Sequence, residues 1–357
     1  MTRIEAIVGL FYDGGPLRPC LDSDPSIRVV PLGKQGRWDI IRFLFRLVGV
    51  LRSLKPDVIH GYLPDANLLA LLAGRLASVP TVVWGIRASN MDFSRYGFIP
   101  RVVFRIAAWL SGFADLIISN SFAGARFHQE SGYSGRRMVV VPNGVDTDLF
   151  APAVDFGKEW RTQWDVPDRG ILIGIVGRID PMKGYEVFLE AAAGLARDRA
   201  DVWFICLGTG PVAYKERLIA RAVQLGVQPR FRWVGHCDDM RRAYNALDIL
   251  SSPSVFGEGF SNVVGEAMAC GVPCVVTDVG DAKQIVGDTG LVIPPREANA
   301  LQAAWSTVLA MGTQERQALG AKARARVVDH YRLERMVANT TTALETAVIA
   351  KRRGGRA

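Results

Sequence analysis

Two acidic and two basic side chains in the second half of the chain have the types and spacing needed to bind phosphate and hydroxyl groups. Arg178 and Lys183 follow the apolar run 171–176, and Glu258 and Glu266 have seven residues between them. Cations beside free backbone N–H groups bind phosphate, arginine as a planar fork and lysine as a mobile point charge. Carboxylates accept hydrogen bonds from paired hydroxyls. Together these residues predict recognition of a diphosphate and of sugar hydroxyls.

The basic pair lies in a turn that runs from Gly177 to Gly184, where a predicted strand ends. Asp180 is expected to cap a helix that Pro181 begins, because Asp favours the N-cap and Pro the first helical position. Both cations would then project beyond the strand, where ligands of parallel sheets bind. The alternative is two solvated surface cations beside a turn.

The acidic pair spans the segment 256–266, in which Gly257 and Gly259 flank Glu258. Glycine lets the backbone approach a ligand closely. Ser261 is expected to cap a helix that runs to Ala269, whose N-terminus would offer N–H groups and a positive dipole to phosphate. Glu266 would lie on the second turn of this helix. The alternative is that Glu266 is an ordinary exposed helix residue, but its apolar neighbours favour a functional role.

Gly208 and Gly210 form a third glycine-rich turn, directly after the apolar run 202–207. Such a strand-to-helix turn lets a ligand approach the backbone. The turn does not complete the pattern GxGxxG, which argues against a classical dinucleotide fold here.

Strand-like apolar runs alternate with helical patterns around these motifs, including helices expected over 40–54 and 101–113. This alternation predicts an α/β fold in which two doubly wound, Rossmann-like domains face a central cleft. The first domain is expected over residues 1–150 and the second over 151–335, joined by a polar stretch through Asp168. A C-terminal helix and tail are expected over 336–357, with either domain as the packing partner.

These motifs together resemble the retaining glycosyltransferases of family 4, which have the GT-B fold. The resemblance is strongest over residues 171–295. Its most specific marks are the pair Glu258 and Glu266, then the strand-end Gly-Arg with Lys183-Gly184, then Pro142-Asn143-Gly144-Val145-Asp146. The resemblance implies transfer of a hexosyl group from a UDP- or GDP-sugar to a polysaccharide, lipid-linked or other glycan acceptor, with no metal or other cofactor.

The same resemblance implies a role for each site residue. Arg178 and Lys183 would bind the donor diphosphate beside Gly177, Glu258 would contact the donor sugar, and Glu266 would bind the ribose hydroxyls. The backbone at Gly259, Phe260, Ser261 and Asn262 would meet the phosphates, with Gly208 and Gly210 nearby. The nucleotide base of the donor would lie near Gly235, His236 and Cys237.

The first half departs from the family pattern in two ways. A strand, a glycine-rich loop and a long helix that the family places before the strand 4–11 are not found in this sequence. Either the start of the chain is misplaced, or the first domain is expected to lack its first β-α unit and with it one wall of the cleft, which bears on activity. Arg87 also stands where many relatives carry a cleft histidine. It is expected to contact the donor phosphate or an anionic acceptor, but it cannot act as a general base because it stays charged. His60, at the tip of the strand 58–59, is the other candidate, with a structural role as its alternative.

Composition sets bounds on compartment and partners. The net charge is +8, which suits an anionic partner or serves solubility alone. Five cysteines without a CxxC pair, and four scattered histidines, predict a reducing, cytoplasmic protein without a structural metal. Segments 38–54 and 101–113 combine arginines with aromatic residues, which suits either an anionic membrane surface, at the inner face of the cell membrane, or the packing of covering helices.

Two other functions fit a double fold of this kind. One is a sugar-nucleotide epimerase, against which the acidic and basic pairs argue. The other is a non-catalytic sugar-nucleotide-binding protein, which the short first half favours and the donor residues oppose. Nucleic-acid binding is not expected, because the charge is diffuse and no recognised module occurs.

Overall fold

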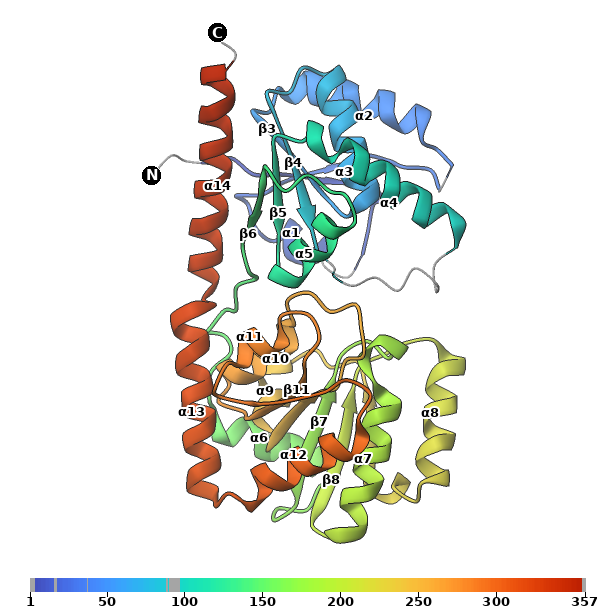
Figure 1. The fold of residues 1–357 in the computed structure, drawn as a ribbon, viewed down its shortest axis with the longest axis vertical. Coiled ribbons are helices and arrows are strands. Elements are labelled where there is room, and N and C mark those ends of the chain that lie inside the picture. Colours follow the sequence, from blue (N-terminus) through green and yellow to red (C-terminus); the bar gives the residue numbers. More distant parts are fainter. Residues whose placement is uncertain (1–3, 16–17, 37, 88, 90–96, 355–357) are drawn as a thin grey trace.

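The computed structural model describes residues 4–15, 18–36, 38–87, 89 and 97–354. Two α/β domains lie end to end, and a pair of C-terminal helices runs along one side of both (Figure 1). The expected α/β class and the two Rossmann-like domains are therefore confirmed.

The first domain holds a four-stranded sheet of order β3-β4-β5-β6 and a separate pair, β1-β2, with all strands parallel. Its elements are β1 (Ile7–Leu10), α1 (Arg18–Asp22), β2 (Arg28–Pro31), α2 (Ile41–Leu54), β3 (Val58–Tyr62), α3 (Pro64–Leu76), β4 (Thr81–Ile86), α4 (Phe98–Leu110), the 3-10 helix η2 (Ser111–Phe113), β5 (Leu116–Ser119), α5 (Phe122–Glu130) and β6 (Met138–Val140).

The second domain contains a continuous six-stranded parallel sheet of order β12-β11-β10-β7-β8-β9. Its elements are α6 (Val154–Gln163), β7 (Ile171–Val176), the 3-10 helix η3 (Pro181–Lys183), α7 (Tyr185–Asp198), β8 (Val202–Leu207), α8 (Val212–Gln224), the 3-10 helix η4 (Gln228–Arg230), β9 (Phe231–Gly235), α9 (Met240–Asn245), β10 (Ile249–Ser252), α10 (Asn262–Ala269), β11 (Cys274–Thr277), α11 (Ala282–Val286), β12 (Leu291–Ile293), α12 (Ala298–Ala310) and α13 (Thr313–His330).

Helices cover both faces of the second sheet, and each face has its own apolar core. The strands β10 and β11 are buried at every residue, as expected for the centre of a parallel sheet. One core includes Leu172, Leu250 and Met268, and the other includes Phe188, Phe204 and Trp305. This packing fixes the carboxyl ends of the strands, from which the turns with the candidate residues extend.

The chain crosses between the domains twice, and the two crossings bond to each other. The N–H of Val145 donates to the carbonyl oxygen of Tyr331 at 2.7 Å, and the N–H of Leu333 donates to that of Val145 at 2.9 Å. Helix α14 (Leu333–Gly354) then lies along the first domain (Figure 1). Its Leu344 and Ala347 pack against a cluster of buried residues on the first sheet: Val83, Leu116, Ile118 and Val141.

Three local expectations need correction. The polar stretch after the first domain contains helix α6, whose side chains pack on α9 rather than forming a loop. The helix expected over 101–113 begins at Phe98 and ends at Leu110, because Ser111–Phe113 tighten into a 3-10 turn. The helix expected over 40–54 begins at Ile41 and ends at Leu54.

Candidate active site

Lys183 and Glu258 form the centre of the site. The Nζ of Lys183 lies 2.8 Å from Oε2 and 3.0 Å from Oε1 of Glu258, so the ammonium bridges the whole carboxylate. The Ser254 hydroxyl donates to Oε2 at 3.1 Å. Glu258 is buried, and the side chain of Lys183 is only 17% exposed. Such a pair is held tightly until a stronger anion competes for the ammonium.

Local hydrogen bonds and a glycine in the turn after β7 fix the position of Lys183. The Asp180 carboxylate accepts from the N–H of Met182 at 3.0 Å, so the predicted cap exists, although it caps the short 3-10 helix η3. Gly184 follows with φ of 73°, and a side chain there would collide with the carbonyl oxygen of Pro253. Glycine at 184 therefore allows the turn to dock on the loop that carries Glu258.

Arg178 lies at the same strand end, but its guanidinium does not join the buried pair. It forms an ion pair with Asp180, with 3.2 Å between Nη2 and Oδ2, and its side chain is 66% exposed. Its further contact is the sulfur of Met182, at 3.6 Å. Arg178 is thus an exposed surface cation paired with Asp180, whereas Lys183 is largely buried against Glu258.

Glu266 lies on the second turn of α10, as expected. Its Oε2 accepts from the hydroxyl of Tyr244 at 2.7 Å. Burial raises the pKa of Glu266, and the Tyr244 hydrogen bond partly offsets that shift. Tyr244 is fully buried on α9 and comes 22 residues earlier in the chain, so sequence reasoning missed it. The bond leaves Oε1 as the oxygen that can accept from a ligand.

The start of α10 differs from the expectation in one respect. Ser261 occupies the N-cap position, but its hydroxyl caps nothing and has no hydrogen-bond partner among the described residues. The side chain of Asn262 points instead to the linker, where its Oδ1 accepts from Nδ2 of Asn143 at 2.9 Å. Phe260 is buried against Tyr331, with 5.4 Å between ring centroids.

The glycine-rich turns at Gly177 and Gly208 pack directly on each other. The N–H of Gly177 donates to the carbonyl oxygen of Leu207 at 2.9 Å, and a side chain at Gly208 would collide with the carbonyl oxygen of Gly177. A side chain at Gly210 would collide with the carbonyl oxygen of Ile179. Close backbone packing therefore explains the glycines at 208 and 210 without a ligand.

Arg87 faces the site from the first domain. Its Nη1 donates to Oδ1 of Asn143 at 2.8 Å, and its guanidinium lies over the ring of Tyr62, 4.9 Å from the centroid. Asn143 bonds in turn to Asn262, so a hydrogen-bonded chain runs from Arg87 through the linker to the start of α10. This chain is the direct link between the first-domain cation and the helix N-terminus expected to meet phosphate.

His60 lies on β3 and stacks on Tyr62, with 4.3 Å between ring centroids. Burial, with a smaller effect of Arg87, lowers the pKa of His60 to about 4. The imidazole is therefore neutral near pH 7, and its Nε2 has no hydrogen-bond partner within the described part of the chain. A neutral imidazole can accept a proton, but its burial suits a structural role equally well.

Asp281 joins the two domains, and sequence reasoning missed it. Its carboxylate accepts from the N–H groups of Phe122, at 2.7 Å, and Ala123, at 2.8 Å, at the start of α5. Burial raises the pKa of Asp281, and these two bonds oppose the shift. Nearby, the Ser89 hydroxyl donates to the carbonyl oxygen of Glu258. The domains thus meet through polar contacts directly beside the Glu258 loop.

The segment after β9 offers the expected residues, but at the surface. His236 is 78% exposed and its Nε2 lies 3.1 Å from Oδ1 of Asp238. Gly235 ends the strand, and Cys237 is a half-buried free thiol. No contact joins His236 to the Lys183–Glu258 pair among the described residues, so its place at a nucleotide base stays a prediction.

Within the described ranges, no group of three or more His, Cys, Asp and Glu residues is arranged to hold a metal ion. None of the helices there is both long and apolar enough to span a membrane.

Two family profiles match the chain, one in each domain. "Glycosyltransferase Family 4" matches residues 7–149, and "Glycosyl transferases group 1" matches residues 170–311. Together they cover both domains and every predicted donor-site residue.

Curated relatives carry glycosyltransferase names. The D-inositol 3-phosphate glycosyltransferase of Geodermatophilus obscurus is 32% identical over 257 residues, which are 67% of this chain and 55% of that protein. The UDP-Gal:alpha-D-GlcNAc-diphosphoundecaprenol alpha-1,3-galactosyltransferase of Escherichia coli is 25% identical over 75% of this chain and 70% of its own length. The chain therefore spans little more than half the length of the first relative.

Solved structures share the arrangement of the two domains. Anabaena HepE in complex with UDP and glucose superposes with a TM-score of 0.85 at 23% identity, covering 95% of this chain and 91% of HepE. A glycosyltransferase from Rickettsia africae superposes with a TM-score of 0.80 at 19% identity, covering 96% and 90%. These similarities support a transferase, and none of them supports an epimerase or a binding protein. With its two matching domains and its GT-B architecture, the chain belongs to the family 4 glycosyltransferases.

Proposed function

We propose that this chain is a retaining glycosyltransferase that moves a hexosyl group from a UDP- or GDP-sugar to a polysaccharide, lipid-linked or other glycan acceptor. The observation that carries the proposal is the buried Lys183–Glu258 pair, together with Glu266 held by Tyr244 in the same domain. A lysine held on a carboxylate is ready to transfer to a donor diphosphate, and the freed carboxylate can then accept from a sugar hydroxyl. One pair thus serves both halves of the donor.

The reaction follows from these roles. The acceptor oxygen bonds to the anomeric carbon on the face from which the diphosphate departs, and the acceptor proton passes to the departing phosphate oxygen. Negative charge develops on that phosphate, where Lys183, Arg178 and the N–H groups at the start of α10 stabilise it. Glu266, oriented by Tyr244, accepts from the ribose hydroxyls. Metal-independent transfer is part of this proposal.

Arg87 is the first-domain residue that we assign to the acceptor side or to the donor phosphate. Its guanidinium is held by Asn143 of the linker, and its charge complements a phosphate. The Escherichia coli relative is named for a diphosphoundecaprenol acceptor, and the Geodermatophilus relative for inositol 3-phosphate. Both names specify acceptors that carry phosphate, in keeping with a cation at this position.

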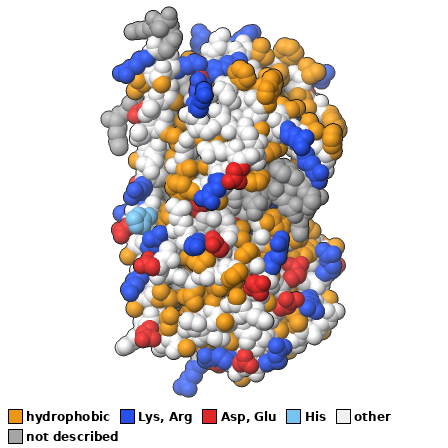
Figure 2. Space-filling model, viewed as in Figure 1, with side chains coloured by type: hydrophobic (Ala, Val, Ile, Leu, Met, Phe, Trp, Pro, Cys, Tyr) orange, Lys and Arg blue, Asp and Glu red, His pale blue; other side chains and the backbone are white. Residues whose placement is uncertain are grey.

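A membrane position at the inner face of the cell membrane is the further part of the proposal. Exposed apolar side chains gather on α4 and at the start of α2, and Figure 2 shows hydrophobic and basic side chains together over the first domain. They include Ile41, Phe45, Phe98, Ile106 and Trp109. Aromatic residues among arginines fit an anionic lipid surface. The five free cysteines support a cytoplasmic location.

Calorimetric titration of UDP, GDP and ADP into the whole chain tests the donor site. We expect one nucleotide to bind, and Glu266→Ala to weaken its binding by about tenfold, because hydrogen bonds to a charged group contribute about 1.5–3 kcal/mol. Glu216→Ala, on the exposed side of α8, is the matched control and should bind as the unaltered chain does. The donor assignment is wrong if no nucleotide binds, or if both variants weaken binding equally.

A further inference from the structure

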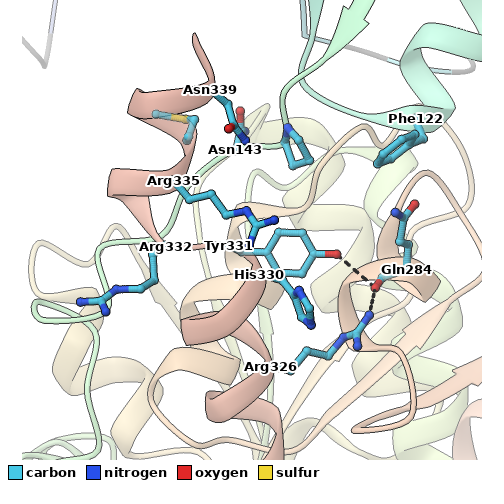
Figure 3. A pocket seen from close by; sticks show the side chains of 11 residues that line it. Phe122, Asn143, Gln284, Arg326, His330, Tyr331, Arg332, Arg335 and Asn339 are labelled. Atoms are coloured by element: carbon cyan, nitrogen blue, oxygen red, sulfur yellow. Dashed lines mark hydrogen bonds between the residues drawn. The ribbon is translucent and has the colours of Figure 1, made fainter. Parts of the chain in front are cut away.

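A cavity opens at the edge of the molecule where the chain crosses between the domains. It has a volume of about 390 Å³ and lies between the end of α13, the start of α14, α11 and the start of α5 (Figure 3). Phe122 lines it from the first domain, Asn143 from the linker, and Gln284 from the second domain. None of the proposed donor-site residues lines it.

The charge of this cavity is one-sided. Four basic residues line it and no carboxylate does: the basic residues are Arg326, His330, Arg332 and Arg335. Arg326 is committed to the wall, since its Nε and Nη2 donate to the carbonyl oxygens of Ile285 and Gln284 at 2.9 and 2.8 Å. Figure 3 shows Arg332 turned outward, whereas Arg335 extends over Tyr331 into the cavity.

Arg335 has donors to spare. One nitrogen, Nη1, donates to the carbonyl oxygen of Asp329 at 3.0 Å, which anchors the side chain and leaves the rest of the fork directed at the cavity. The ring of His330 and the amide of Asn339 stand on either side of it (Figure 3). A guanidinium with an adjacent imidazole and amide offers phosphate oxygens several hydrogen-bond donors. Amide groups and the aromatic ring of Tyr331 also suit a polyhydroxylated ligand.

The cavity is separated from the donor site by packed side chains. Tyr331 forms one wall, and its other side packs against Phe260 of the donor loop. Its hydroxyl donates to the carbonyl oxygen of Gln284 at 3.2 Å, so the wall is pinned. A ligand here would not overlap a nucleotide held by Lys183 and Glu266, although Asn143 touches both regions through its bonds to Arg87 and Asn262.

We propose that this cavity binds the phosphate monoester of a small polyhydroxylated molecule, at a site distinct from the donor site. The inference does not depend on the proposed transferase activity. Because both domains, the linker and the C-terminal crossing contribute to the lining, a bound phosphate also stabilises the arrangement in which these four segments meet.

Titration of glucose 6-phosphate into the whole chain, with and without saturating UDP, tests the proposal. We expect binding that UDP does not displace, and no binding of glucose, which lacks the phosphate. Arg335→Gln should weaken binding about tenfold or more, through loss of a charge-assisted contact. Lys322→Gln, on the exposed side of α13, is the matched control and should leave it unchanged.

A second variant separates loss of the site from loss of folding. Asn339 is exposed on α14, so Asn339→Asp is expected to fold normally and to repel the phosphate, again weakening binding about tenfold. The proposal is overturned if glucose 6-phosphate does not bind, if glucose binds equally well, if UDP displaces it, or if both variants bind like the control.

The phosphate monoester can come from a soluble metabolite or from a lipid headgroup. Sedimentation with phosphatidylcholine vesicles that contain phosphatidate distinguishes the sources. Loss of vesicle binding in Arg335→Gln and Asn339→Asp, but not in Lys322→Gln, assigns the site to a lipid headgroup. Loss of glucose 6-phosphate binding alone assigns it to a soluble ligand. UDP titration of the same variants should be normal, which keeps failure here distinct from failure of the donor site.

Discussion

The second sheet is continuous over six strands, whereas the first domain divides its strands between a sheet of four and a separate pair. Large exposed hydrophobic side chains are concentrated in the first domain and are sparse in the second. The side chains of the candidate donor-site residues Lys183, Glu258 and Glu266 are held by hydrogen bonds within the second domain. The second domain thus holds its candidate site residues in fixed positions, whereas the first exposes a larger apolar surface.

Loss of the buried cation in the second domain should have the largest effect. We expect Lys183→Ala to lower turnover by about 10²–10³-fold, as for removal of one group that stabilises developing charge. Single-turnover assays with the nucleotide sugar that binds would measure it, with Lys322→Ala as the control. Because Lys183→Ala leaves Glu258 buried without its partner, Lys183→Ala/Glu258→Gln should be compared by circular dichroism to show that both are folded. Turnover unchanged in the folded variant would remove Lys183 from the mechanism.

Acid should act on the first domain through His60. Its pKa is lowered to about 4 in the folded chain, so its contribution to stability is present above the ordinary pKa near 6.5 and is lost as pH falls toward 4. The free energy of unfolding falls by about 3 kcal/mol at most through this residue. Urea unfolding between pH 7 and pH 4 should show a shallower decline for His60→Gln than for the unaltered chain. His236→Gln, which changes an exposed ring, should follow the unaltered chain, and parallel curves for all three would contradict the assignment.

The contact between the domains should have a smaller effect. Asp281→Asn removes the carboxylate that accepts from two N–H groups of α5, and we expect it to cost about 1–2 kcal/mol, as for loss of a helix cap. Thermal unfolding followed by calorimetry would measure the change. Asp278→Asn lies three residues earlier on an exposed side chain and serves as the control. Equal stability of the two variants would show that Asp281 does not hold the domains together.

Substitutions on the surface of the first domain should have the smallest effect on protein stability, but they should clearly weaken binding to lipid vesicles. Trp109 and Phe98 are 76% and 80% exposed, so serine at both positions should leave stability nearly unchanged. Binding to vesicles of anionic lipid should weaken by about tenfold or more, since burying each aromatic side chain contributes about 1.5–3 kcal/mol. Val212→Ser/Val223→Ser on α8 is the matched pair in the second domain. If that pair weakens binding equally, the contrast between the domains does not extend to lipid.

Sequence reasoning singled out candidate residues in short segments at strand ends, where local chemistry is visible without a fold. The structure brings two of them together, since Lys183 and Glu258 form a buried ion pair, whereas close backbone packing accounts for the glycines at 208 and 210. Sequence reasoning did not find Tyr244 or Asp281, because only packing brings their partners close. Tyr244 lies 22 residues from its partner Glu266, and Asp281 lies 159 and 158 residues from the two N–H groups that it accepts from.

Other errors have equally local causes. Ser261 has the residue type and position of a cap, yet its hydroxyl is buried without a partner among the described residues. Helix α6 was missed because its polar sequence resembles a linker, although it packs against α9. The lack of a first β-α unit stays a prediction. The structure shows that the strands β1 and β2, which come before the four-stranded sheet in the chain, form a separate pair.

The position of α14 has a consequence for how the chain is made. Its side chains cover Val83, Leu116, Ile118 and Val141, and Lys351 and Arg352 form ion pairs with Asp115 and Asp57. During synthesis the first domain leaves the ribosome long before residues 333–354 do, so this apolar face of its sheet stays uncovered while the whole second domain is translated. Completion of the first domain therefore waits for α14, and a nascent chain stalled before α14 would be a natural substrate for chaperones.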